Sequence, residues 1–210
     1  MTTNPTPKAK PVRGSGRALI LAAAMDLIRQ KGFAAMSVEE LCAAAGITKG
    51  AFFHHFRSKD DLGVAAVLHW SEITDAMFAA ARYHQLSNPL DRVLGYLDLR
   101  ASLLGDEIAA FSCVAGTAVQ ELHLSHPDIR KASGVAIAGG AGHVLAHLEQ
   151  ALQSAPEIDA SAESLAYFIQ VAIQGGIVVA KSQSDARFAR EAIEHVRRYL
   201  LMLFGRTTSA

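Results

Sequence analysis

Apolar residues along this chain recur mainly every three or four positions, with little of the strict alternation that a half-buried strand requires. That period matches one face of an α-helix, and half of the residues are apolar, with much Ala, Leu and Ile. The pattern, with its Gly, Pro and Asn breaks, predicts helices over residues 16–31, 38–45, 49–55, 58–86, 89–104, 108–124, 127–153, 160–182 and 185–204. We therefore expect an all-α fold.

The most informative stretch is residues 37–59, where two short helices meet at a tight turn. Ser37 is followed three residues later by Glu40, which is the spacing of a capping box at a helix start. Gly46 can end this helix, and Thr48 is a good N-cap for the next. Two short helices joined by a short Gly-containing turn form a helix-turn-helix unit, whose second helix enters the major groove of DNA.

Chemistry then suggests which side chains would touch DNA. Phe52 and Phe56 supply an inward face, which leaves the other side of the second helix outward. Amide groups at a helix start bind phosphate, a lysine ammonium can meet guanine, and an alanine methyl can meet thymine. Any one of these side chains alone would be an ordinary surface residue. The expected DNA-binding residues are Arg17, Ser37, Thr48, Lys49, Gly50, Ala51, Phe53, His54, His55 and Lys59.

The run TKGAFFHHFRSKDDL at 48–62, with GFAAMSVEELCAAAGI at 32–47 before it, resembles the DNA-binding region of the TetR family of bacterial transcriptional regulators. The resemblance implies that His55 and Lys59 contact the DNA backbone. Where this chain has Phe53, the family usually has Tyr. The missing hydroxyl removes one phosphate hydrogen bond, which costs about 1 kcal/mol of binding. Beyond residue 62 the resemblance weakens sharply.

The distribution of charged residues also separates the N-terminal region from the rest of the chain. Residues 1–60 carry nine Lys/Arg against four Asp/Glu, whereas residues 61–210 carry eleven against sixteen. A basic N-terminal module on an acidic body suits a polyanion contacted at one end only. The first residues, 1–15, form a basic arm, which is either a solubilising tail or an arm that follows phosphates or enters a minor groove.

We expect three parts: the flexible arm at 1–15, a helix-turn-helix domain at 16–62, and a helical ligand-binding and dimerisation domain at 63–210. Two distant cysteines make no disulfide framework and no secretory segment is seen near the start, so we expect a cytoplasmic protein. Uncharged stretches at 133–148 and 164–180 contain His or Gln and several glycines, so we interpret them as buried helices and not as membrane spans.

The resemblance also implies a homodimer, in which the last two long helices pair with those of a second subunit. One helix-turn-helix reads too few base pairs for selectivity, whereas a two-fold pair reads a palindrome with half-sites about 34 Å apart or a multiple of that. The alternative for these apolar stripes is an intramolecular core. The stripes are Ile169, Ile173, Ile177 and Ala180, then Ala189, Ile193, Val196, Leu200 and Leu203.

Relatives of this kind bind small molecules among the body helices, although most helical aromatics are simply core. The candidate ligand-binding residues are His69, Trp70, Met77, Phe78, Phe111, Cys113, His123, Tyr167, Phe168, Gln170, Gln174 and Lys181. Cys113 and Lys181 resemble the pair used by TetR-family sensors of electrophiles or oxidants, since a nearby ammonium activates a thiol. The alternative, which we favour, is a buried inert thiol and a helix-end lysine. We interpret Cys42 as a small hydrophobe.

These observations favour a ligand-responsive DNA-binding transcriptional regulator, a repressor that binds a palindromic operator as a homodimer and is released by a small-molecule or electrophile inducer. The competing class is a helical enzyme or carrier whose N-terminal unit serves only as a docking module. The sequence contains no GxSxG, HExxH or CxxC motif and no phosphate-binding Gly loop, so we expect no catalysis, cofactor or metal.

Overall fold

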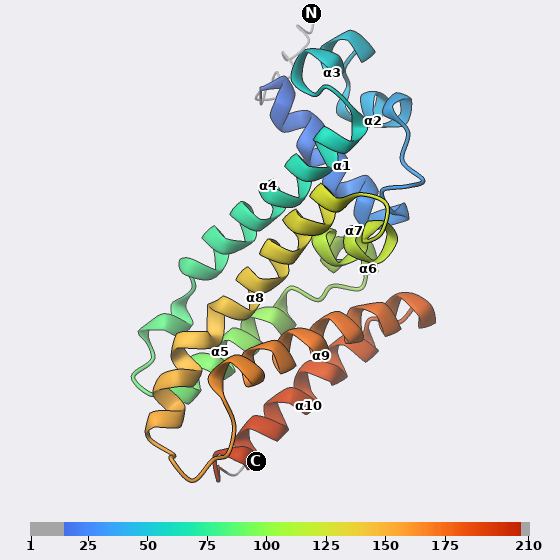
Figure 1. Ribbon diagram of the computed structural model, residues 1–210. Coiled ribbons are helices and arrows are strands. Elements are labelled where there is room, and N and C mark those ends of the chain that lie inside the picture. The colour runs from blue at the N-terminus through green and yellow to red at the C-terminus, as the bar shows by residue number, and fades with distance from the viewer. Residues whose placement is uncertain (1–14, 207–210) are drawn as a thin grey trace, which may run out of the picture.

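A computed structural model describes residues 15–206, and in this part of the chain all regular structure is helical (Figure 1). The all-α prediction is therefore confirmed. The helices are α1 Gly16–Lys31, α2 Val38–Ala45, α3 Lys49–His55, α4 Lys59–Ala79, the 3₁₀ helix η1 Arg82–Gln85, α5 Pro89–Ser102, α6 Ile108–Phe111, α7 Val114–Leu122, α8 Pro127–Gln153, α9 Ala162–Gln183 and α10 Arg187–Leu203. The arm was expected at residues 1–15. Residues 1–14 of it lie outside the part of the chain that the structure describes.

Side-chain caps define the starts of α2, α3 and α4. The hydroxyl oxygens of Ser37, Thr48 and Ser58 accept hydrogen bonds from the backbone N–H three residues on, at 3.1, 3.2 and 3.0 Å. Gly46 ends α2 with φ +65°, a left-handed conformation that glycine adopts without steric cost. The helix-turn-helix predicted from these residues is therefore present.

Two predicted helices differ from the structure for reasons that sequence spacing does not reveal. The long helix over 58–86 ends at Ala79, because His84 folds back and its Nε2–H donates to the Phe78 carbonyl at 3.0 Å. The predicted helix over 108–124 breaks into α6 and α7. At the break, the Ser112 hydroxyl donates to the Ile108 carbonyl at 2.7 Å, and the Cys113 sulfur accepts from the Gly116 N–H to cap α7.

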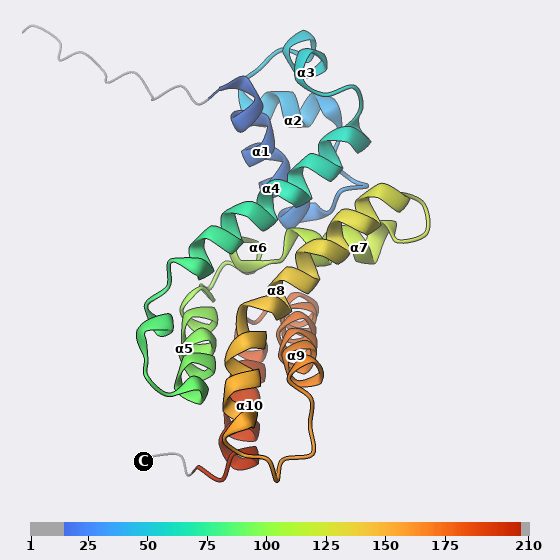
Figure 2. The same cartoon turned by 60° about the vertical axis from the view of Figure 1, so that its left-hand side comes forward.

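Two hydrophobic cores hold the molecule together. The first contains buried side chains of α1, α2, α3 and the start of α4, and it also contains α7 and the start of α8. The second is formed by the end of α4 with α5, α8, α9 and α10. Because α4 and α8 lie side by side and extend from the DNA-binding end into the body, both helices contribute to both cores (Figures 1 and 2).

The stripes expected to face a second subunit lie mainly in the second core. Ile169, Ile173 and Ile177 of α9, and Ile193 and Leu200 of α10, are each at most 5% exposed. The intramolecular alternative therefore holds for these residues. By length and composition alone, α9 is also apolar enough to cross a membrane, but its inner face is part of this core.

Three histidines lie beside the second core: His143 and His147 of α8 are half-buried, and His84 of η1 is exposed. The Nε2–H of His84 is committed to the Phe78 carbonyl, so its Nδ1 accepts from His147 Nε2–H at 3.1 Å. The remaining nitrogen of His147 is buried and has no hydrogen-bond partner among residues 15–206. Burial lowers the pKa of His147, and the nearby Arg92 and His84 lower it further. Burial likewise lowers the pKa of His143, against an opposing effect of Asp75.

These lowered pKa values predict that acid destabilises the fold. Below about pH 6.5, the ordinary histidine pKa, the unfolded chain binds protons that folded His143 and His147 do not, so the free energy of unfolding falls as pH falls. Thermal unfolding between about pH 7.5 and 5.5 should show a drop in Tm, by about 2–4 °C for each kcal/mol lost. His147→Gln should reduce this drop, whereas His123→Gln, at an exposed position, should keep it. An unchanged pH dependence in His147→Gln would contradict the assignment.

Candidate DNA interface and effector cavity

The second helix of the helix-turn-helix, α3, presents a sharply divided surface. Phe52 is fully buried and contacts Phe56, with ring centroids 5.9 Å apart, so α3 is anchored to α1 and α2. Phe53 next to it is 50% exposed, although it is a large apolar side chain. Lys49, Gly50 and His54 are also exposed. An exposed aromatic beside basic groups at the tip of the molecule fits a surface that packs against DNA.

Lys49 is held by an ion pair in the absence of DNA. Its ammonium donates to the Glu39 carboxylate of α2 at 2.5 Å, and both side chains are largely exposed. The hydrogen bond and the charge of Glu39 raise the pKa of Lys49. Because exposed ion pairs are weak and screened by salt, Lys49 can exchange Glu39 for a phosphate or a base.

The other expected contacts differ in how they are placed. His55 packs against the start of α1, where a Cβ on Gly16 would lie 2.9 Å from its Nε2. The Arg17 guanidinium lies over the Phe56 ring, 5.4 Å from its centroid. Lys59 is partly withdrawn: its Nζ donates to the Ala34 carbonyl at 3.2 Å and lies above the Phe33 ring, and burial lowers its pKa.

A cavity of about 240 Å³ lies at the boundary between the two cores. One wall belongs to the first core and comprises Trp70, Cys113, Ala115, Ala136 and Ile137. The opposite wall belongs to the second core and includes Met77, Phe78, Leu104, Phe111, Ile173, Ile177 and Ile193. A mainly apolar cavity with a few polar groups is the usual form of a small-molecule site.

Polar groups enter this cavity from four helices. Asp75 of α4 pairs with His143 of α8 at 3.1 Å, and Arg100 of α5 lies over the Phe78 ring. Gln174 of α9 also lines the cavity. Asp75, Arg100 and His143 were not among the expected ligand-binding residues. At helical spacing they look like ordinary polar residues, and only the packing of α4, α5 and α8 brings them together.

A smaller cavity of about 170 Å³ adjoins the first and shares Cys113 and Gln174 with it. Lys181 lines it and donates to the Thr117 hydroxyl at 3.1 Å. Burial lowers the pKa of Lys181, and the charges of Cys113 and Glu121 oppose this effect. Cys113 thus lies on a cavity wall near Lys181. Cys42 instead is buried in the first core, and burial raises the pKa of its thiol.

The expected ligand-binding residues fall into two groups. Those that line the larger cavity are Trp70, Met77, Phe78, Phe111, Cys113, Gln170 and Gln174. The others are Lys181, which lines the smaller cavity, and His69, His123, Tyr167 and Phe168, which line neither. Tyr167 and Phe168 lie on the outer face of α9, where they are about 40% exposed.

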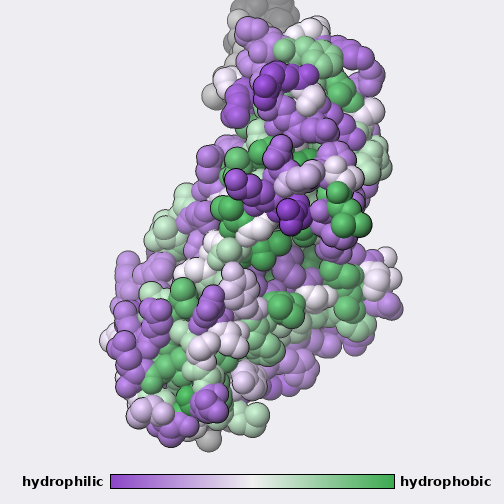
Figure 3. Space-filling model, viewed as in Figure 1, coloured by the Kyte–Doolittle hydropathy of each residue, from purple (hydrophilic) through white to green (hydrophobic). Residues whose placement is uncertain are grey.

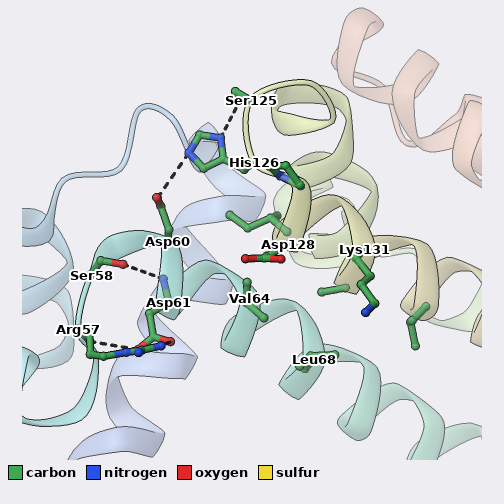
Figure 4. Close-up of a pocket in the computed structure, with 14 residues that line it drawn as sticks. Arg57, Ser58, Asp60, Asp61, Val64, Leu68, Ser125, His126, Asp128 and Lys131 are labelled. Atoms are coloured by element: carbon green, nitrogen blue, oxygen red, sulfur yellow. Dashed lines mark hydrogen bonds and ion pairs between the residues drawn. The ribbon is translucent and has the colours of Figure 1, made fainter.

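A third hollow, an open groove of about 730 Å³, lies between the start of α4 and the start of α8 (Figure 4). Across its end, His126 Nε2 lies 3.5 Å from an Asp60 carboxylate oxygen, and His126 Nδ1 lies 2.7 Å from the Ser125 hydroxyl. Asp61 is bound by Arg57 on the same side of the groove. The His126–Asp60 contact ties the DNA-binding end to the body. The groove is wide and exposed, unlike the cavity between the cores.

Two further contacts connect the cavity walls to the DNA-binding helices. Arg29, near the end of α1, donates to the Ala110 carbonyl at 2.8 Å and lies over the Trp70 ring, and both Ala110 and Trp70 line the larger cavity. Glu121 of α7 accepts a hydrogen bond from the Ala34 N–H at 3.0 Å, in the loop between α1 and α2. Each of these connections is made by a single side chain, so the cavity walls contact the DNA-binding module directly.

An exposed recognition helix on a helical body with an internal cavity defines a helix-turn-helix DNA-binding regulator. Residues 20–66 match the family model for bacterial regulatory proteins of the tetR family. The chain is 30% identical over 147 residues to the HTH-type transcriptional repressor NemR of Escherichia coli K12, over 66% of this chain and 67% of NemR. It is 25% identical over 139 residues to the transcriptional regulator AcuR of Cereibacter sphaeroides, over 62% and 64% of the two chains. The chain belongs to the TetR family of ligand-responsive DNA-binding regulators.

Solved structures share the fold over nearly the whole chain. A TetR-family regulator from Agrobacterium tumefaciens superposes with a TM-score of 0.77 at 21% identity, covering 92% of this chain and 98% of that one. The reduced form of E. coli NemR gives a TM-score of 0.74 at 24% identity, covering 88% and 97%. The competing interpretation, an enzyme or carrier, is not favoured, since the relatives named here are regulators.

The Lys49–Glu39 pair predicts that Glu39→Gln strengthens DNA binding. Removing the carboxylate frees one cation at the interface, so the affinity should rise a few-fold and the slope of log affinity against log salt should steepen by about one. Titration of a fluorescent duplex at several salt concentrations measures both quantities. Glu149→Gln, an exposed charge on α8 far from the helix-turn-helix, is the matched control and should change neither. Weaker binding by Glu39→Gln would contradict the prediction.

Proposed function

We propose that the protein is a repressor that binds a palindromic operator as a homodimer and leaves it when a small molecule fills the cavity between the two cores. The observation that carries this proposal is the position of the cavity. One wall belongs to the core that holds the recognition helix, and the other belongs to the body. A molecule bound there touches both and favours one arrangement of the two over another.

The contacts of Arg29 support a direct route from ligand to DNA. A ligand that moves Trp70 or the Ala110 carbonyl removes the stacking and the hydrogen bond that position the end of α1. Because α1 packs against α2 and α3, the recognition helix follows. A ligand that binds the released state better by about 2.7 kcal/mol shifts the equilibrium a hundredfold, which is sufficient for induction.

The outer faces of α9 and α10 support dimerisation. Val171 is 69% exposed and Met202 is 75% exposed, although both are apolar. Phe168 and Tyr199 form an edge-to-face pair between the two helices, with ring centroids 5.1 Å apart. In Figure 3, green apolar side chains reach the surface of the body where Figure 1 shows α9. A second copy that packs α9 and α10 against their counterparts would cover this face as a four-helix bundle.

The cellular setting and the inducer's chemistry follow from the same proposal. A repressor works where chromosomal DNA is, in the cytoplasm. The inducer is a small molecule held without covalent bonds, or an electrophile that alkylates Cys113 on the cavity wall. In the second case the neighbouring Lys181 would stabilise the thiolate.

Titration against duplex DNA from upstream of the protein's own gene tests the function. Tight binding of two protomers per site, absent with a scrambled duplex at the same salt concentration, is the expected result. Val171→Arg should give a monomer in analytical ultracentrifugation and lower the specific affinity by roughly 100-fold or more, because the second half-site is then lost. Val135→Arg places the same charge on α8 at a similarly exposed position and should stay dimeric. Equal, steeply salt-dependent binding to both duplexes would reject operator recognition.

Arg29→Gln should separate DNA binding from communication with the cavity. Trp70 is the single tryptophan and lies on the cavity wall, so operator binding should change its emission in the wild-type protein. The variant should bind the operator within a few-fold of wild type but lose most of that emission change. Lys31→Gln removes a positive charge two residues away that pairs with Glu40 and does not line the cavity, so it should keep the change. An undiminished change in Arg29→Gln would exclude this route.

A further inference from the structure

The two charged side chains that line the larger cavity differ in what they can offer a ligand. Asp75 is already engaged through both oxygens: Oδ1 lies 3.1 Å from His143 Nε2, and Oδ2 accepts from the Ser71 hydroxyl at 3.2 Å. Arg100 has no carboxylate within 4 Å and no hydrogen-bond acceptor among residues 15–206. Its guanidinium lies 5.6 Å from the centre of the Phe78 ring, at the cavity wall.

The surroundings of Arg100 hold its positive charge at the cavity wall. The Phe78 ring is almost fully buried in the second core and supports one face of the guanidinium, so the half-buried Arg100 side chain lies at the cavity wall. An arginine is always charged and presents a planar fork of N–H donors that matches the two oxygens of a carboxylate. A half-buried guanidinium with free donors therefore favours an anion.

The size and the remaining walls limit the rest of the ligand. A cavity of about 240 Å³ has room for roughly eight to ten non-hydrogen atoms, since one water accounts for about 30 Å³ of liquid and covalently bonded atoms lie closer together than waters do. The rest of the lining is mainly aliphatic and aromatic, including Leu104, Phe111 and Ile173. Such walls bind an apolar body and exclude a sugar or a nucleotide, whose hydroxyl and phosphate groups would lack partners.

We propose that the effector is a small organic acid of roughly eight to ten non-hydrogen atoms in all, with a single carboxylate bound by Arg100 and an apolar body in the cavity. This inference rests on the proposed function, because it assigns the ligand of the same regulatory cavity. A cationic ligand at Asp75 would share the carboxylate with His143 and Ser71, which already donate to its two oxygens. An anion needs no such sharing at Arg100.

The test uses matched acid and amide probes: phenylacetate with phenylacetamide, and hexanoate with hexanamide. Each pair has the same shape and differs in charge. Titration of the full-length protein, followed by Trp70 emission, should show each acid binding roughly ten- to a hundredfold more tightly than its amide. Arg100→Gln should abolish this preference, and Arg100→Lys should retain part of it. Arg130→Gln, which removes an exposed charge of α8 that lines neither cavity, should leave it unchanged.

Release of the operator duplex by the same probes separates this inference from the proposed function. Acids that bind and release the duplex support both. Amides that bind and release it as well as the acids do, or an acid preference that survives in Arg100→Gln with an unchanged Tm, overturn the acid assignment and leave the ligand-released repressor standing. If neither class changes Trp70 emission or operator binding, the acid assignment and the cavity's regulatory role both fail.

Discussion

The helix-turn-helix of this protein has no hydrophobic core of its own. Leu41 and Phe52, which hold α2 and α3, share one continuous core with Leu122 of α7 and Ile129 of α8. The close approach is possible because position 63 is glycine: a Cβ there would lie 2.6 Å from the Phe33 ring and 2.8 Å from Ile129. The apolar surface that stabilises the recognition helix therefore comes in part from the effector domain, and the two cannot move independently at this junction.

This sharing is the physical basis of our proposal that a ligand in the cavity next to that core controls DNA binding. Packed cores change by discrete shifts and not by gradual deformation, so a ligand between two cores selects among their relative positions. The first core moves as a unit with α1 and α3. Arg29 and Glu121 add polar contacts across the same boundary, which makes the relative position of the two parts sensitive to small changes at the cavity wall.

Local signals allowed much of the fold to be predicted. Ser37, Thr48 and Gly46 define helix ends through contacts within a few residues, and α1 and α8 occur at the predicted bounds because Ser15 caps the first and Pro127 starts the second. Features without such a local signal in the sequence were missed. One is the end of α4, where His84 reaches back to the Phe78 carbonyl.

The candidate sites divide in the same way. The predicted DNA-contact residues, apart from Arg17, lie within one short motif, whereas the charged groups of the cavity come from α4, α5 and α8, whose packing no spacing rule provides. In α9 apolar residues occur on all sides, so the sequence could not show that Ile173 faces inward and Val171 outward.

The contact between Glu121 and the loop after α1 has a consequence for building hybrid regulators. Gly32 has φ +89°, and a Cβ there would lie within 1.8 Å of a Glu121 oxygen, so the loop is shaped to receive this carboxylate. A chimera that transplants residues 15–62 onto another family member's body would separate the loop from Glu121 and cut through the first core. Exchange of DNA specificity between such proteins is therefore better achieved by replacing surface residues of α3 than by grafting the whole module.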